Sequence, residues 1–180
     1  MDLVHPKTLP QQREMIGSDV VELLQILAQN HLDVWFDGGW GVDALLGQQT
    51  RPHGDLDILI QHKDVPKLRE LLGAKGYKDV PRDDTRDCNF VLSNAHGREV
   101  DVHSFTFDAA GNWIYEGIPY QADSLSGTGS VNGYSVKCVS PEWMINFHSG
   151  YELDMDDYHD VFALCQRFGF EIPPDFDKFK

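Results

Sequence analysis

Apolar residues recur along this chain with two different spacings, and each spacing predicts a different kind of element. Between residues 18 and 29, apolar side chains recur every three or four positions, which predicts an amphipathic helix. Ser18 precedes this stripe and is a residue type that often caps a helix. The same criteria predict further helices over about residues 64–75, 141–148 and 156–168.

Short apolar or alternating segments, bounded by turn residues, predict strands instead. Val34–Phe36 is one such segment and residues 56–60 are another, and between them a short helix over residues 40–46 ends at Gly47. Further strands are predicted over residues 77–80, 88–92, 99–107, 113–115, 118–121 and 134–139.

Three segments carry no such spacing. Residues 124–133, SLSGTGSVNG, are rich in Gly and Ser and predict a flexible loop or lid. The first residues, up to about residue 17, predict a loose lead-in, and the tail from residue 171 predicts irregular structure.

This order of elements predicts an α+β fold, with a small mixed β-sheet, helices packed on one side and further helices at the C-terminus. The length of 180 residues favours a single domain. We expect its core over about residues 18–140 and a helical C-terminal part over about residues 141–170.

Composition limits the partners and the location. There are 29 acidic and 15 basic residues, a net charge of −14, which disfavours a nucleic-acid partner and favours a cationic small molecule. No apolar run is long enough to span a membrane, and the first ten residues contain no apolar segment typical of a signal peptide. The three scattered cysteines predict reduced thiols, so we expect a cytoplasmic protein with no membrane partner.

Two acidic residues open the strand predicted at residues 56–60. Asp55 and Asp57 are two positions apart, so in an extended strand both carboxylates point to the same face. Carboxylates held together repel each other unless a cation lies between them. Mg²⁺ takes one or two carboxylates and completes its shell with water and phosphate oxygens. The pair therefore predicts a Mg²⁺ site.

A phosphate site is predicted beside these acids. Gly38 and Gly39 form a turn that leads into a helix, where free backbone N–H groups can bind an anion. Arg51 and His53 lie in the loop before the acids, where a positive charge could meet a triphosphate. The alternatives are a plain tight turn and solvated loop charges. Together, phosphate site and acids are what a phosphoryl or nucleotidyl transferase requires.

A third carboxylate stands in the strand predicted at residues 99–107. Asp101 alternates with Val100 and Val102, so it shares the opposite face with His103. An unpartnered charge in an apolar strand is unfavourable, which favours a role for Asp101, although a half-exposed strand could also carry it. The histidines show no zinc-ligand spacing, and we expect ordinary polar roles for them.

These motifs resemble a known superfamily. Gly38-Gly39, then fifteen residues, then Asp55-Leu56-Asp57 resembles the signature of DNA polymerase β-type nucleotidyltransferases. The longer string FDGGWGVDALLG, with Arg51 and His53, resembles the lincosamide nucleotidyltransferases and, next, the aminoglycoside 2″-nucleotidyltransferases. The segments VDVH at residues 100–103 and FHSGYEL at residues 147–153 fit the same comparison.

The resemblance implies a nucleotidyltransferase fold and an enzyme that moves a nucleoside monophosphate group from a triphosphate such as ATP to a hydroxyl of an antibiotic. Asp101 would complete a triad with Asp55 and Asp57, as a metal ligand or as the general base, around two Mg²⁺ ions. The resemblance also implies a homodimer.

Two other functions fit part of the sequence. A nucleotidyltransferase of the toxin–antitoxin type, which modifies a protein hydroxyl, would share the metal motif. Gly39-x-Gly41-x-x-Ala44 has the form of a dinucleotide-binding turn, although the paired acids do not suit that class. The sequence contains no GxxxxGK[ST] motif, which excludes a P-loop kinase.

Overall fold

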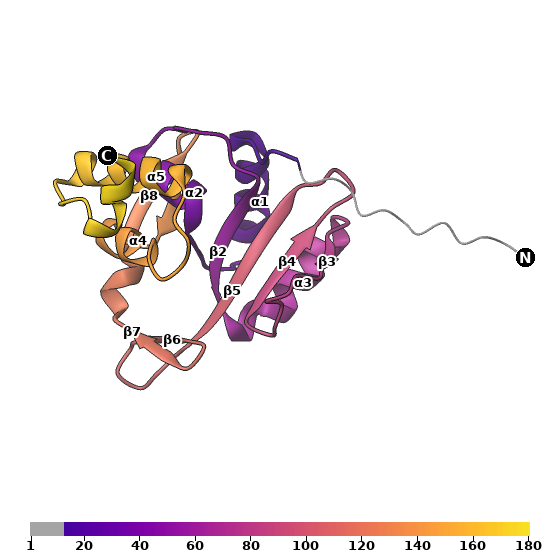
Figure 1. The fold of residues 1–180 in the computed structure, drawn as a ribbon. Coiled ribbons are helices and arrows are strands. Elements are labelled where there is room, and N and C mark those ends of the chain that lie inside the picture. The colour runs from indigo at the N-terminus through magenta and orange to yellow at the C-terminus, as the bar shows by residue number, and fades with distance from the viewer. Residues whose placement is uncertain (1–12) are drawn as a thin grey trace, which may run out of the picture.

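The computed structural model describes residues 13–180, in which nine strands form a mixed β-sheet (Figure 1). The main path through the sheet runs β3-β4-β5-β2-β1-β9-β8, and the β6–β7 hairpin extends from β5. The strands are β1 (Val34–Phe36), β2 (Asp55–Gln61), β3 (Lys78–Val80), β4 (Asn89–Ser93), β5 (Glu99–Phe107), β6 (Trp113–Tyr115), β7 (Ile118–Tyr120), β8 (Gly127–Val131) and β9 (Tyr134–Cys138).

Helices accompany the sheet in the predicted order. The α-helices are α1 (Gly17–Gln29), α2 (Gly38–Leu46), α3 (Val65–Ala74), α4 (Pro141–Phe147) and α5 (Met155–Phe168), and the short 3₁₀ helices are η1 (His62–Asp64), η2 (Ala122–Leu125) and η3 (Pro174–Phe179). The sequence therefore predicted each α-helix to within a few residues. The tail is less irregular than expected, because η3 inserts the fully buried Phe176 into the core. Residues 1–12, most of the predicted lead-in, lie outside the described residues.

Strands β2 and β5 form the parallel centre of the sheet. Their register pairs Asp57 with Asp101 and Ile58 with Val102. Ile58 and Val102 are fully buried on one face, whereas the two acids are only half-buried on the other. The alternation that the sequence predicted therefore separates an apolar face from an acidic one.

Helices α1 and α3 cover the apolar face (Figure 1). The Arg69 guanidinium of α3 lies 3.9 Å from the ring centroid of Phe90, which is paired with Val102 in the sheet. Lys67 of α3 donates a hydrogen bond to the carbonyl of Asn30 at the end of α1. The mixed sheet with helices on one side is thus confirmed.

The N-terminus of α1 differs from the prediction. Ile16 rather than Ser18 is the N-cap, and Ser18 lies inside the helix. Asp19 accepts a hydrogen bond from the Ile16 N–H at 3.4 Å and forms ion pairs with Arg13 and Arg98. The buried, doubly paired aspartate fixes the start of the helix where the sequence shows only a serine of suitable type.

The expected flexible loop at residues 124–133 is instead part of the sheet. Residues 127–131 form β8, which pairs antiparallel with β9. Gly129 is needed for packing, because a Cβ there would lie 2.8 Å from the backbone nitrogen of Leu45 in α2. The Gly-rich composition therefore reflects a close approach of helix to strand, not flexibility.

The remaining helices gather at the β8 end of the sheet. Helix α2 contacts β8, α4 and α5. Asp154 caps α5 by accepting hydrogen bonds from the N–H groups of Asp156 and Asp157, and Gly169 ends the helix in a left-handed conformation. This packing brings the C-terminal part of the chain beside the helix that follows the Gly38-Gly39 turn.

The connection through α2 excludes the dinucleotide-binding alternative. Strands β1 and β2, on either side of α2, are antiparallel, whereas a dinucleotide-binding βαβ unit needs parallel strands. Gly41 serves packing instead, since a Cβ there would lie 3.0 Å from the carbonyl oxygen of Phe36.

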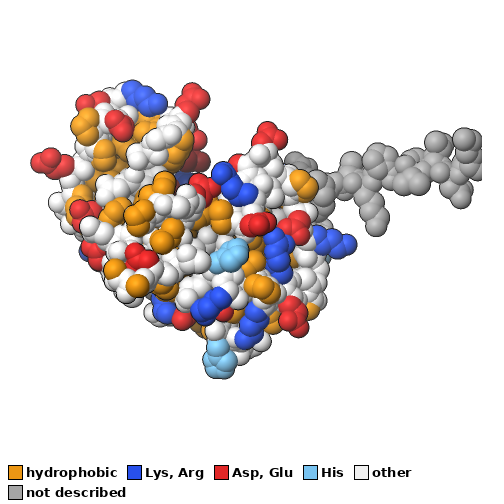
Figure 2. Space-filling model, turned by 90° about the horizontal axis from the view of Figure 1, so that it is seen from below, with side chains coloured by type: hydrophobic (Ala, Val, Ile, Leu, Met, Phe, Trp, Pro, Cys, Tyr) orange, Lys and Arg blue, Asp and Glu red, His pale blue; other side chains and the backbone are white. Residues whose placement is uncertain are grey.

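Several hydrophobic side chains remain exposed on the C-terminal part. They are Tyr151, Met155, Phe162, Phe168 and Phe170. Figure 2, which views the molecule from the end bearing the β6–β7 hairpin, shows hydrophobic side chains spread over the half of that face on the side of the C-terminal helices.

The three cysteines are free thiols, as predicted. Within residues 13–180, no helix combines the length and hydrophobicity needed to cross a bilayer.

Two glycines test the packing account of β8. Gly129→Ala should lower the free energy of unfolding by about 1–3 kcal/mol, because the new methyl group has no space against α2. Gly73→Ala, at an exposed position of α3 with nothing within 4 Å, should raise it by about 0.5–1 kcal/mol. Urea unfolding of both variants measures the difference. Equal stability of the two variants would contradict the packing account.

Candidate active site

The acids that the sequence singled out come together on the open face of the sheet. A carboxylate oxygen of Asp57, one of Asp101 and a ring nitrogen of His103 all lie within 4.8 Å of one another. Asp55, two residues before Asp57 on β2, faces the same side. The parallel pairing of β2 with β5 produces this cluster from residues more than forty positions apart.

One oxygen of Asp101 lacks a partner. Its Oδ1 is buried and accepts no hydrogen bond from residues 13–180, and the Nε2 atom of His103 is 3.7 Å away. Buried polar atoms are nearly always satisfied in proteins, so an orphaned carboxylate oxygen in an acidic cluster fits a cation ligand. The other ring nitrogen of His103 lies 3.2 Å from the Tyr115 hydroxyl, which fixes the imidazole beside the carboxylate.

Burial and mutual repulsion disfavour the charged forms of these acids. The pKa of Asp57 is raised well above its usual value by burial and then by the negative charges of Asp55, Asp101 and Asp37. Burial also raises the pKa of Asp55, opposed by the positive charges of His53, Arg51 and Arg82. The pKa of Asp101 is raised by burial, with His103 opposing and Asp55 adding to the shift. A bound cation would favour the charged forms of these three acids.

The Gly38-Gly39 turn lies directly against this cluster. Gly38 has a φ of +55°, and a Cβ there would lie 2.7 Å from the Asp57 Cγ. A Cβ on Gly39 would lie 2.5 Å from the His53 Cε1 and 3.0 Å from the Arg51 Nη2. Only glycine allows this approach of backbone to acids and loop cations. The turn also starts α2, so its free N–H groups stand at the positive end of a helix.

Asp37 precedes this turn and holds it through its backbone rather than its side chain. It is the N-cap residue of α2, but its side chain makes no capping hydrogen bond. Its backbone N–H donates to the carbonyl of Asp57 at 3.1 Å, which ties the turn to β2. Its carboxylate adds a third negative charge near Asp57, after those of Asp55 and Asp101.

His53 is buried and paired rather than exposed in the loop. Its Nε2 lies 2.5 Å from Asp43 Oδ2, and its ring packs on Trp40 with the centroids 5.1 Å apart. Asp43 also accepts hydrogen bonds from the backbone N–H and the hydroxyl of Thr50, at 3.0 and 2.6 Å. Asp43 therefore braces the loop that carries Thr50 and His53. Contact between His53 and a nucleotide stays a prediction.

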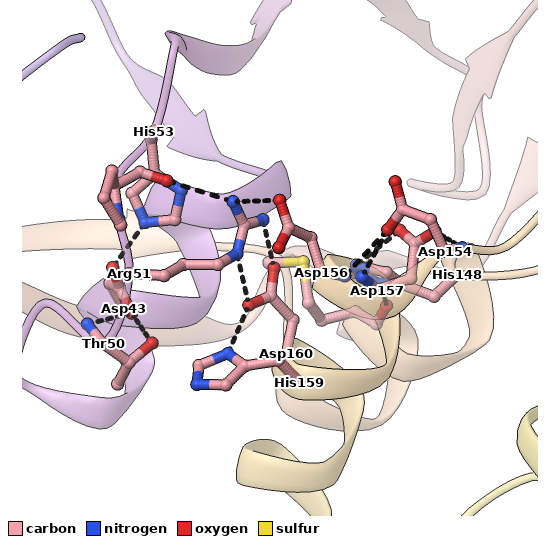
Figure 3. Close-up of polar contacts among 12 residues, drawn as sticks. Asp43, Thr50, Arg51, His53, His148, Asp154, Asp156, Asp157, His159 and Asp160 are labelled. Atoms are coloured by element: carbon pink, nitrogen blue, oxygen red, sulfur yellow. Dashed lines mark hydrogen bonds and ion pairs between the residues drawn. The ribbon is translucent and has the colours of Figure 1, made fainter. Parts of the chain in front are cut away.

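Arg51 is held by an acid that sequence reasoning did not identify. Its Nε and Nη2 donate to the two oxygens of Asp160 in α5, at 2.9 and 2.6 Å (Figure 3). Its Nη1 lies 3.5 Å from the exposed Asp156. Asp160 is 109 residues from Arg51 in sequence, so only its position as a buried acid on a helix could have drawn attention to it.

Two hollows flank the acidic cluster. A polar one of about 290 Å³ lies between β4, β5 and residues 82–85, and its lining includes Asp55, Arg82, Asp84, Glu99 and Asp101. An aromatic one of about 240 Å³ lies on the other side and is lined by Asp37, Leu59, His103, Trp113, Tyr115, Tyr120 and Phe147. The polar hollow thus reaches Asp55 and Asp101 themselves, whereas the aromatic hollow reaches their neighbours Asp37 and His103.

Comparison with known proteins identifies the family of the chain. A model of the aminoglycoside-2''-adenylyltransferase family matches residues 19–164. A lincosamide resistance protein of Staphylococcus haemolyticus is 31% identical over 145 residues, which are 77% of this chain and 88% of the relative. A 2''-aminoglycoside nucleotidyltransferase of Klebsiella pneumoniae is 34% identical over 67 residues, 34% of this chain and 38% of the relative.

Solved structures share the fold. The lincomycin-bound lincosamide antibiotic adenylyltransferase LnuA superposes with a TM-score of 0.74 at 27% identity, over 84% of this chain and 98% of that one. ANT(2'')-Ia in complex with adenylyl-2''-tobramycin gives a TM-score of 0.68 at 19% identity, over 85% and 89% of the two chains, which supports the fold alone. The predicted nucleotidyltransferase fold is confirmed. Because the family match spans most of its length, the chain belongs to the aminoglycoside-2''-adenylyltransferase family and is a nucleotidyltransferase.

Proposed function

We propose that this enzyme transfers a nucleoside monophosphate group from a nucleoside triphosphate to a hydroxyl of a small antibiotic, a lincosamide or an aminoglycoside, and releases pyrophosphate. The observation that carries this proposal is the convergence of Asp55, Asp57 and Asp101 against the Gly38-Gly39 turn. The printed functions of the relatives, lincosamide resistance and 2''-aminoglycoside nucleotidyl transfer, support the acceptor class.

The acids would hold divalent cations, which we take to be two Mg²⁺ ions. Asp57 and Asp101 with their neighbour Asp55 supply the oxygen ligands that Mg²⁺ prefers, and the unpartnered Asp101 Oδ1 fits such a ligand. Bound Mg²⁺ would neutralise charge on the triphosphate and on the departing pyrophosphate. His103 is better suited to orienting the Asp101 carboxylate than to binding a hard cation.

The triphosphate would rest on the Gly38-Gly39 turn. The N–H groups at the start of α2 and the nearby positive charge of Arg51 favour an anion there. Arg51 and His53 both lower the pKa of Asp55, which supports their nearness to the cluster. In this arrangement the turn orients the phosphates so that the α-phosphorus faces the acids.

Asp101 would act as the general base toward the acceptor. The acceptor hydroxyl oxygen attacks the α-phosphorus, its proton passes to the Asp101 carboxylate, and the bond from the α-phosphorus to the bridging oxygen of pyrophosphate breaks. The position of Asp101 in the lining of the polar hollow supports this role, because an acceptor hydroxyl bound there would lie within reach of its carboxylate.

The polar hollow suits a cationic acceptor. Its single arginine, Arg82, pairs with Glu99, so Asp84 stays available for a positive group when Asp55 and Asp101 hold the metal ions. An ammonium group of the acceptor could lie near Asp84 while its hydroxyl lies near Asp101. This agrees with the net charge of the chain, −14.

We also propose that the enzyme is a homodimer, as the resemblance implies. The exposed hydrophobic side chains of the C-terminal part, Tyr151, Met155, Phe162, Phe168 and Phe170, are consistent with a covered face. Analytical ultracentrifugation should give twice the chain mass of 20.4 kDa, and a monomer at micromolar concentration would contradict this part of the proposal.

The reaction itself is tested by pyrophosphate release. With Mg²⁺ and each of ATP, CTP, GTP and UTP, wild-type protein should release pyrophosphate only when a lincosamide or aminoglycoside acceptor is present. Asp101→Asn should lower kcat by about 10²–10⁴-fold through loss of the base, and Asp57→Asn should abolish turnover. Asp123→Asn, an exposed acid on η2, should behave as wild type.

Failure of every antibiotic with wild-type protein that still binds Mg²⁺ and nucleotide would contradict the antibiotic assignment and favour a protein acceptor. Unchanged turnover in Asp57→Asn would contradict the whole site.

Repulsion among the three acids also predicts that removing one charge stabilises the protein when no metal is bound. The pKa of Asp57 is higher in the folded protein than in the unfolded chain. The protein therefore loses stability as the pH rises from the unfolded-state pKa of this acid through its folded-state pKa. In EDTA at pH 8, Asp57→Asn should therefore be more stable than wild type, and the difference should shrink as the pH falls toward 4. Thermal unfolding measures it. A variant less stable than wild type at pH 8 would contradict the repulsion described above.

A further inference from the structure

Arg51 is the best-anchored cation at the Gly38-Gly39 turn. The loop that carries it is fixed before and after it: Thr50 is bound to Asp43, and so is His53. Its Nη2 lies close enough to Gly39 that a Cβ there would be 3.0 Å away. The guanidinium therefore stands over the start of α2, where the proposed triphosphate would bind.

Asp160 fixes the plane of this guanidinium. The carboxylate is 1% exposed and accepts two hydrogen bonds from Arg51, at 2.9 and 2.6 Å, in a bidentate arrangement (Figure 3). A carboxylate buried this deeply requires a partner, and a bidentate pair is the geometry that best restricts arginine. Because Asp160 comes from α5, the C-terminal helix reaches the turn through this pair.

Asp156 contacts the same arginine in a different way. Its carboxylate is 69% exposed and lies 3.5 Å from Nη1, a distance at which a hydrogen bond is weak. Asp160 thus holds the Nε–Nη2 edge firmly, whereas Nη1 donates a hydrogen bond to the Pro52 carbonyl at 3.2 Å and contacts Asp156 only loosely. An incoming phosphate oxygen could displace Asp156 from Nη1 without disturbing the pair with Asp160.

We propose that Asp160 is a positioning residue, which orients Arg51 so that Nη1 meets the triphosphate, and that Asp156 is a displaceable competitor for the same nitrogen. The proposal rests on the proposed function, because it takes the triphosphate to bind at the Gly38-Gly39 turn. It makes helix α5 part of nucleotide binding, although α5 contributes no group that touches the nucleotide.

The two acids therefore form a matched pair for experiment. The dissociation constant of α,β-methylene-ATP with Mg²⁺, measured by calorimetry, reports binding without any acceptor. Asp160→Asn should weaken binding about tenfold or more, because Arg51 loses its orientation. Asp156→Asn should tighten binding, since a competing negative charge is removed. In turnover, Asp160→Asn should raise KM for the triphosphate more than it lowers kcat.

A double-mutant cycle separates positioning from a general effect on folding. If Asp160 acts through Arg51, Asp160→Asn should have little further effect on nucleotide binding in an Arg51→Gln background. Thermal unfolding of each variant establishes that the compared proteins are folded.

Four results would overturn the proposal: Asp160→Asn binding as tightly as wild type, equal weakening by both substitutions, a loss confined to kcat, or a full Asp160→Asn effect without Arg51. Wild-type protein that does not bind the nucleotide would contradict the proposed phosphate site and this inference together. Wild-type protein that shows the expected binding pattern but reacts with no antibiotic would contradict only the acceptor assignment.

Discussion

Electrostatic repulsion among Asp55, Asp57 and Asp101 is the constraint on which the rest of this site depends. Parallel pairing of β2 with β5 forces Asp57 and Asp101 side by side, and burial raises the pKa of each. A fold selected only for stability would not keep three such acids together. Bound cations and phosphate relieve the repulsion among the acids. The repulsion in the free protein therefore favours cation binding at this site.

The opposite face of the same strands stabilises the sheet against this repulsion. The alternate residues of the same strands, such as Ile58 and Val102, are fully buried under α1 and α3. Hydrophobic burial on that face offsets the repulsion on the other. On the acidic face, Gly38 allows the backbone to contact Asp57, and Gly39 allows it to contact Arg51. The Arg51–Asp160 pair ties α5 to the same turn. Stability and chemistry are thus divided between the two faces of one strand pair.

Much of this could be predicted from sequence, because it is local. Alternation along β2 and β5 fixes which face the acids occupy, and a Gly-Gly turn before a helix is a short-range pattern. Features that depend on distant neighbours could not be predicted. Gly129 looks flexible until α2 lies against it, and Asp160 looks like an ordinary helical acid until Arg51 approaches from 109 residues away. His103 carried a signal in sharing a face with Asp101, but only the sheet register brings Asp57 to it.

The central claim is that the three acids hold divalent cations together with a nucleoside triphosphate. Electron paramagnetic resonance of Mn²⁺, titrated in the presence of α,β-methylene-ATP, tests it most directly. The account predicts that wild-type protein binds Mn²⁺ beyond the amount held by the nucleotide alone, and that Asp55→Asn loses this binding. If wild-type protein binds no additional Mn²⁺, or if Asp55→Asn binds it equally well, the carboxylate cluster is not a metal site and the account is wrong.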